Sequence, residues 1–245
     1  FNAWDQTSGT AGLEGTKRDT TISGGTSAYS SGTDTASVVV TAVNDAPVVT
    51  VSGGSASWTE GNNVASTPVA VDPGLTLSDA DGPNPLNATA RMLTYFSAQD
   101  TLSFVNDGLT MGNIIGTWTV GNGTLTLTSA GNQATVAQFE AALRAITYNN
   151  SSNSPNSTTR TVQFIVTDGS NAQSTAVTRD VSITAVNDSP TINAVASLPI
   201  TEDTQTALGQ ITFSDVDSTL GVATFSVGSG TLSAIGAGGV TVGGT

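Results

Sequence analysis

The sequence contains no cysteine and no histidine, and its six basic residues are five arginines and one lysine. These absences exclude disulfides, thiolate nucleophiles and Ser-His-Asp triads, and they remove the usual ligands of zinc, haem and iron. The remaining general bases are carboxylates. The carboxylates that lie close enough in sequence to act as a pair are in predicted turns at the linkers. We therefore expect no enzymatic activity.

Positive charge and long apolar runs are also scarce. Nineteen acidic residues against six basic ones give a net charge of −13, which disfavours binding to nucleic acid because phosphate backbones are repelled. No apolar run approaches the roughly 20 residues of a membrane-spanning helix, and no signal peptide is recognisable, so we expect no membrane insertion. The chain begins with Phe1 instead of Met, and we expect it to be a window of a longer protein.

The sequence is rich in short runs of Val, Ile and Thr that are separated by Gly, Asn, Asp and Pro. Such runs are typical of all-β proteins. Disorder is the alternative for a chain with so much Gly and Ser, but the regular apolar runs favour a folded β-sandwich. We predict strands near residues 48–52, 66–71, 91–96, 101–105, 114–120, 123–128, 161–167 and 175–186.

One short helix is predicted at residues 136–146. Thr135 and Gln138 have the spacing of a capping box, in which each side chain bonds the backbone N–H of the other residue. The apolar residues that follow recur at helical spacing, so one face of the helix should join the core. They are Val136, Phe139, Leu143 and Ile146.

The chain repeats itself. The string TAVND occurs at residues 41–45 and 184–188, and each copy is followed by a Pro, then by Thr-Glu, then by Ser-Asp-x-Asp. Residues 164–168 also match residues 1–5, since both are apolar runs that end on an Asp. We therefore predict that residues 1–45 are the closing strands of one repeat, 46–188 a complete repeat and 189–245 the opening of a third.

Each predicted linker carries a set of oxygen ligands. An Asn-Asp pair lies in the linker, and an Asp-x-Asp turn follows it in the next repeat. Ca²⁺ takes six to eight oxygen ligands from carboxylates, amides and backbone carbonyls. A single Asp-x-Asp could be a solvated turn, but its recurrence beside the same Asn-Asp pair favours calcium sites. The predicted ligands are Asn44, Asp45, Asp79 and Asp81 at the first linker, and Asn187, Asp188, Asp215 and Asp217 at the second.

These motifs resemble a known family. Residues 166–190 are similar to the closing strands and linker of a cadherin repeat, and Asp79-Ala80-Asp81 resembles the Asp-Ala-Asp that ligates linker calcium there. The TAVNDAP linkers, the SDADG turn and the YNNSSNSP segment before an Arg-Thr-Val-x-Phe strand resemble the cadherin-like repeats of giant bacterial RTX-type (type I secreted) surface adhesins. The likeness covers almost the whole chain.

The resemblance implies tandem Ig/cadherin-like sandwiches, secretion to a bacterial cell surface, and calcium at the linkers. It adds Glu60 to the second linker's ligands, and it adds Asp168, which matches the Asp of the family's Ala-x-Asp-x-Gly element. The implied partners are neighbouring repeats and a cell-surface or matrix ligand bound by another region. This chain departs from the family's linker motif at Ala42, Ala46, Ala185 and Ser189 and lacks its Asp-Arg-Glu element, so we expect one or two ions per linker.

The function that this sequence favours is a calcium-stiffened spacer or stalk. Three alternatives stay open. The Gly/Ser/Thr-rich stretch at residues 6–34 could be the recognition loop of a lectin-like module. The incomplete end repeats could exchange strands and form a filament. Asp79 and Asp81 could serve a hydrolase, although two residues apart they are better placed to share an ion.

Overall fold

The computed structural model describes residues 2–4, 21, 29–33, 35–209, 211–218, 221–234 and 236. It divides the chain into two compact units, Phe1–Val43 and Asn44–Thr245. In the first unit, β1 (Asn2–Trp4) pairs antiparallel with β2 (Tyr29–Thr33). Asp5 and most of the predicted recognition loop at residues 6–34 lie outside the described residues.

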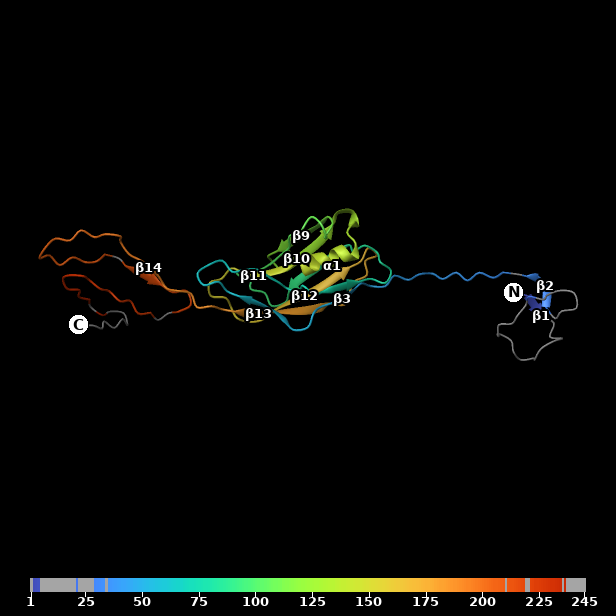
Figure 1. Cartoon of the computed structure of the whole chain (residues 1–245), viewed down its shortest axis with the longest axis horizontal. Coiled ribbons are helices and arrows are strands. Elements are labelled where there is room, and N and C mark those ends of the chain that lie inside the picture. The colour runs from blue at the N-terminus through green and yellow to red at the C-terminus, as the bar shows by residue number, and fades with distance from the viewer. Residues whose placement is uncertain are drawn as a thin grey trace. The chain divides into compact units, whose positions relative to one another are not determined.

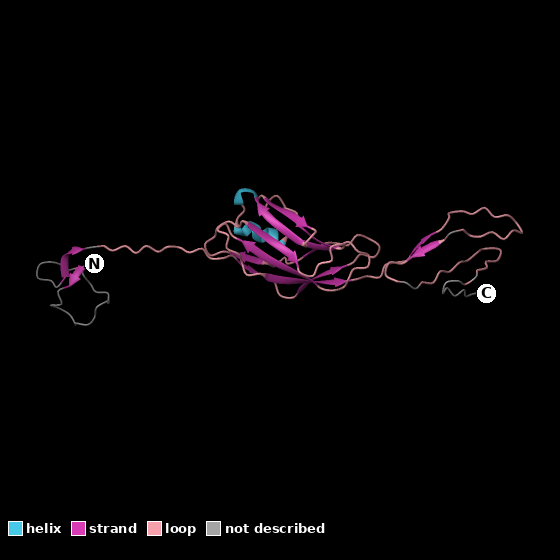
Figure 2. Cartoon of the chain, turned by 180° about the vertical axis from the view of Figure 1, so that it is seen from behind, coloured by secondary structure: helices cyan, strands magenta, loops and turns pink. Residues whose placement is uncertain are grey.

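The second unit contains an all-β sandwich with one short α-helix, as predicted, and a single 3-10 turn at Ala130–Asn132 precedes that helix (Figures 1 and 2). Its larger sheet has six strands, in the order β4 (Ser55–Thr59), β13 (Val177–Thr184), β12 (Arg160–Thr167), β7 (Asn87–Met92), β10 (Thr124–Ser129) and β9 (Ile114–Thr119). Two smaller sheets complete the sandwich: β5 (Val69–Ala70), β11 (Thr147–Asn150) and β8 (Asp100–Ser103), and the pair β3 (Val48–Thr50) with β6 (Thr76–Ser78).

The hydrophobic core lies between these sheets. Buried and partly exposed residues alternate along β10 and β12, which is the pattern of strands with one face in the core. Trp58 of β4 is fully buried and meets Tyr148 of β11 edge to face, with ring centroids 6.0 Å apart. This contact joins the large sheet to a smaller one, because the two rings come from different sheets.

The helix α1 (Val136–Arg144) confirms the predicted capping box. Gln138 N–H donates to Thr135 Oγ1 at 3.3 Å, and Thr135 N–H donates to Gln138 Oε1 at 2.9 Å. Phe139 and Leu143 are buried, as the helical spacing predicted. The helix was predicted to reach Ile146 but ends at Arg144. The carbonyl of Ile146 accepts from Val71 N–H at 2.9 Å.

The predicted strand positions differ from the structure in two ways. The strand expected at 91–96 lies at 87–92, and the short strands β4, β6 and β11 were not predicted. The buried positions of β11 are Tyr148 and Asn150, so its alternation is not one of apolar and polar residues. Asn150 is buried because its amide donates to Asp100 at 2.9 Å.

That bond belongs to a buried polar network. Arg160 Nε donates to Asp100 Oδ2 at 2.8 Å, and both side chains are fully shielded from solvent. The Tyr148 hydroxyl donates to the other oxygen of Asp100 at 2.7 Å, and burial is the largest cause that raises the pKa of this hydroxyl. The Arg160 guanidinium also lies 4.3 Å from the centre of the Phe96 ring. The network connects β8 and β11 of a smaller sheet to β12 of the larger one.

Beyond the sandwich, β14 (Thr191–Asn193) pairs with β15 (Thr212–Ser214). Thr191 lies opposite Ser214, as Val48 lies opposite Ser78 in the pair of β3 and β6. Both second strands therefore lead directly into an Asp-x-Asp turn, at Asp79 and at Asp215.

Candidate metal-binding junctions

Ten predicted ligands fall into two clusters in the second unit. Junction 1 comprises Asn44, Asp45, Asp79, Asp81 and Asp168, and junction 2 comprises Glu60, Asn187, Asp188, Asp215 and Asp217. The sequence predicted the linker and turn residues of both. The hydrogen bonds of the structure show how each set is held.

In junction 1, the linker contacts two strand ends. Asp45 N–H donates to Asp81 Oδ2 at 2.5 Å, and Asn44 Nδ2 donates to Asp168 Oδ2 at 2.7 Å. Asp79 and Asp81 follow β6, whereas Asp168 follows β12. The ends of β6 and β12 therefore meet at the end of the sandwich where the linker enters.

The Asp-x-Asp turn of junction 1 uses one carboxylate oxygen to cap itself. Asp79 Oδ1 accepts from the backbone N–H groups of Asp81 and Gly82, both at 3.1 Å. Gly82 has a φ of 67°, a left-handed conformation that glycine adopts without strain. The second oxygen of Asp79, Oδ2, is buried and has no hydrogen-bond partner. It is free to face a cation.

Asp168 is fully buried, and its carboxylate is well satisfied. Burial acts to raise its pKa, but the bonds from the Asn44 amide and from backbone N–H groups outweigh burial and lower the pKa. Oδ1 alone accepts from the N–H groups of Ser170 and Ala172, each at 2.8 Å. This carboxylate is therefore held ionised at the junction by neutral donors.

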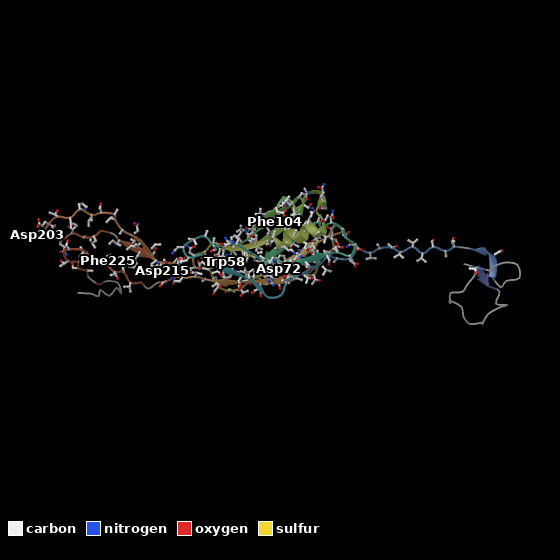
Figure 3. The ribbon with its side chains drawn as sticks, viewed as in Figure 1. Trp58, Asp72, Phe104, Asp203, Asp215 and Phe225 are labelled. Atoms are coloured by element: carbon white, nitrogen blue, oxygen red, sulfur yellow. The ribbon has the colours of Figure 1, made fainter. Side chains whose placement is uncertain are left out.

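Junction 2 repeats the linker geometry of junction 1. Asp188 N–H donates to Asp217 Oδ2 at 2.5 Å, and Asp215 Oδ1 accepts from the N–H groups of Asp217 and Ser218 at 3.0 Å. Asn187 Nδ2 donates to Asp188 O at 2.8 Å, as Asn44 Nδ2 donates to Asp45 O at 2.9 Å in junction 1. Figure 3 labels Asp215 beyond the sandwich. The sequence repeat thus corresponds to a repeat of the hydrogen bonds.

Junction 2 also contains two carboxylates from the base of the sandwich. Glu60 Oε2 accepts from Val186 N–H at 2.9 Å, and Asp188 Oδ1 accepts from the backbone N–H of Asn63. The other oxygens, Glu60 Oε1 and Asp188 Oδ2, are buried without a partner. Burial raises the pKa of Glu60 most, and the negative charges of Asp188 and Asp217 add to it, against the lowering bond from Val186. These carboxylates repel one another.

Two residues of junction 2 were not predicted from the sequence. Asn62 Nδ2 donates to Asn187 O at 2.9 Å, and Asn63 Nδ2 donates to Ser189 O at 2.9 Å. Asn63 has a φ of 50°, a left-handed conformation that Asn tolerates better than most residues. Two adjacent Asn residues after a Thr-Glu pair were the available signal.

The residues of both junctions fit a hard cation, because every donor is a carboxylate or amide oxygen. In the described part of the chain, no group of three or more acidic side chains is already arranged to hold a metal ion. Several carboxylates instead accept from backbone N–H groups of the turns and linkers. The fit rests on the three buried oxygens that have no partner, Glu60 Oε1, Asp79 Oδ2 and Asp188 Oδ2.

Comparison with known proteins assigns no family. No model of a known protein family matches the chain, and no curated protein matches its sequence. Among the helices that the structure describes, none is long and apolar enough to cross a bilayer. The interpretation of the junctions therefore rests on their own residues.

Proposed function

We propose that residues 46–188 are one repeat of a calcium-stiffened, cadherin-like extracellular array that acts as a spacer or stalk at a bacterial cell surface. The observation that supports it best is the pair of buried, unpartnered carboxylate oxygens in junction 2, Glu60 Oε1 and Asp188 Oδ2. Burying a charge without a partner costs free energy. A divalent cation between them would remove that cost.

In this proposal, Glu60 and Asp188 hold the ion from the base of the complete repeat, and Asp215 and Asp217 hold it from the next one. Binding neutralises the mutual repulsion of the four carboxylates and ties both repeats to one ion. At junction 1 the proposed ion is held by Asn44, Asp45, Asp79 and Asp81. The predicted ligand Asp168 already accepts from Asn44 and from backbone N–H groups, and its role is to hold the linker in place. The implied partners are neighbouring repeats, together with a surface or matrix ligand bound by another region.

The expected stabilisation is moderate. Extracellular calcium modules bind with dissociation constants of about 10⁻⁴ to 10⁻³ M. At the tighter limit, about 10 mM calcium adds roughly 2.7 kcal/mol per site. For a domain of this size, we expect the melting temperature to rise by several degrees.

The test compares thermal melting and small-angle scattering in calcium and in chelator. We expect calcium to raise the melting temperature and the maximum dimension, and the double variant Asp215→Asn, Asp217→Asn to lose the part that comes from junction 2. The matched control is Asp107→Asn, because Asp107 caps a loop outside both junctions. A melting temperature and a maximum dimension that both ignore calcium would contradict the proposal.

The lectin-like alternative depends on residues 6–34, most of which lie outside the described residues. It stays a prediction, as does assembly by strand exchange. The absence of enzymatic activity and the location at a cell surface are parts of the same proposal.

A further inference from the structure

Strands β4 and β13 form a parallel pair. Asp180 lies opposite Ser55, and the register continues to Thr184 opposite Thr59. Every other strand pairing in the described residues is antiparallel. Strand β4 lies near the start of the complete repeat and β13 near its end. The chain's entry and exit are therefore joined to each other by one ladder.

The two ends of the repeat lie at opposite ends of this ladder. The entering linker bonds Asp168, which follows β12 and lies beside the start of β13 because the two strands are antiparallel. The leaving linker is bonded by Asn63, which follows β4. Tension along the chain therefore pulls β4 and β13 in opposite directions, parallel to their axes, because the two strands run in parallel.

This geometry decides how the backbone bonds are loaded. When two strands slide past each other, all the bonds of the ladder carry the load together. When two strands are peeled apart from one end, the bonds break one at a time. Each bond contributes little by itself, so resistance depends on how many must break at once. Because β4 and β13 are parallel, tension makes them slide, and all the backbone bonds between them carry the load together.

A buried arginine reinforces the ladder where the load enters. Arg179 lies in β13 and is nine-tenths buried. Its Nη1 donates to the carbonyls of Ser52, Gly53 and Gly54 at 2.5, 2.6 and 2.9 Å. These carbonyls immediately precede β4. The same segment is held from the other side by Asp72, labelled in Figure 3, which accepts from Ser52 N–H and Oγ at 2.8 and 2.6 Å.

Two further bonds extend the ladder where the load leaves. Glu60 N–H donates to Thr184 O at 3.0 Å, and Val186 N–H donates to Glu60 Oε2 at 2.9 Å. Between the two ends, Ser182 Oγ donates to Ala56 O at 3.1 Å. Each end of the β4–β13 ladder is thus closed by a side chain that bonds the backbone of the opposite segment.

Trp58 anchors the ladder to the rest of the sandwich. Its ring is fully buried, and its Nε1 donates to Asn149 Oδ1 at 3.1 Å, on a strand of a smaller sheet. For β4 to slide, this ring must leave the core as the ladder breaks. Sliding therefore couples the loss of hydrogen bonds to the exposure of a large aromatic side chain.

We propose that the complete repeat bears tensile load and that the β4–β13 ladder, closed by Arg179 and Glu60, is the element that resists it. The ladder requires no metal. The proposal thus goes beyond calcium stiffening and can fail or hold independently of it.

The test is single-molecule force spectroscopy of the whole chain in chelator, with two pulling directions. Because the chain has no cysteine, a pair of introduced cysteines defines the direction. Ala46→Cys with Ser189→Cys makes β4 and β13 slide past each other, and Val64→Cys with Ser189→Cys peels them apart from one end. All three positions are exposed. We expect a severalfold higher unfolding force for sliding, and equal forces would overturn the proposal.

Two arginine variants test whether the bonds of Arg179 contribute to the sliding force. Arg179→Met removes the three bonds to the segment before β4 and should lower the sliding force while leaving the peeling force nearly unchanged. The control is Arg144→Met, because Arg144 also bonds a carbonyl, Leu75 O at 2.6 Å, but does so from α1, outside the ladder. Equal losses of sliding force in both variants would contradict the assignment. If Arg179→Met does not fold, the two pulling directions of the unsubstituted repeat still decide the question.

Calcium separates this proposal from the previous one. Forced unfolding reports the barrier along the pulling direction, not the equilibrium stability. A high sliding force in chelator supports the ladder whatever calcium adds, and calcium stiffening is decided separately by the melting temperature and the scattering. A low sliding force in chelator contradicts the ladder, whatever calcium adds.

Discussion

Junctions 1 and 2 share the bonds that the linker Asn and Asp make to each other and to the Asp-x-Asp turn, but they differ in the acidic residue that faces them from the sandwich. In junction 1 this residue is Asp168, whose carboxylate is surrounded by N–H donors that lower its pKa. In junction 2 it is Glu60, whose pKa is raised by burial and by the charges of Asp188 and Asp217. The two residues lie at opposite ends of the same sandwich, so the difference is one between its entry end and its exit end. The Asp168 carboxylate is satisfied by hydrogen bonds within the protein, whereas Glu60 Oε1 is buried without a partner.

The largest expected effect is a loss of stability at Asp168 that does not depend on calcium. Asp168→Ala removes the acceptor of several buried N–H groups, and we expect it to lower the free energy of unfolding by about 3 kcal/mol. The loss should be of similar size in calcium and in chelator, because most of it comes from backbone donors left unpaired. Urea unfolding in the two conditions measures it.

The control for that variant is Asp79→Ala, which removes a turn cap and an unpartnered oxygen but fewer buried bonds. We expect a smaller loss in chelator than for Asp168→Ala. If Asp79→Ala costs as much as Asp168→Ala in chelator, the contrast between a satisfied and an unsatisfied carboxylate is wrong.

A medium effect is expected at Glu60. Glu60→Gln keeps the size of the side chain and removes its charge, so in chelator the free energy of unfolding should stay equal or rise, because the repulsion from Asp188 and Asp217 is relieved. In calcium, the variant should lose most of the roughly 2 to 3 kcal/mol that this site adds. Calorimetric titration and thermal melting together check both signs.

Glu140→Gln is the matched control for Glu60, because Glu140 pairs with Arg144 on the helix and lies in neither junction. Its substitution should leave the calcium response unchanged. A Glu60→Gln variant with the full calcium response would remove Glu60 from the proposed ligands.

The smallest effect is expected at Asn63, a residue of junction 2 that bonds the linker where it leaves the sandwich. Asn63→Gly keeps the left-handed backbone conformation and removes the amide bond to Ser189 O, so we expect a loss of about 0.5–1 kcal/mol. Asn63→Ala should cost about 1 kcal/mol more, since alanine is strained at that φ. Thermal melting of the two variants separates the lost bond from the backbone strain, and equal melting temperatures would show that φ at residue 63 adds nothing.

The all-β class, the capped helix and the Asp-x-Asp turns could be predicted because each depends on residues close together in the chain. Thr135 and Gln138 cap the helix within one turn, and Asp79 bonds the N–H two residues further on. A local motif contains both partners of its interactions. Its recurrence in the sequence is enough to predict its recurrence in the structure.

Only the tertiary structure decided which distant segments meet. Asn44 bonds Asp168, Glu60 bonds Val186 and Arg179 bonds Ser52, each across more than a hundred residues. Alternation along a strand shows which side chains face the core, but it does not show which strand lies next to it or in which direction. The sequence by itself determined the all-β class, the helix cap and the recurring Asp-x-Asp turns. The order of the strands in the sheet decided that Asp168 is satisfied, that Glu60 is not, and that β4 and β13 run in parallel.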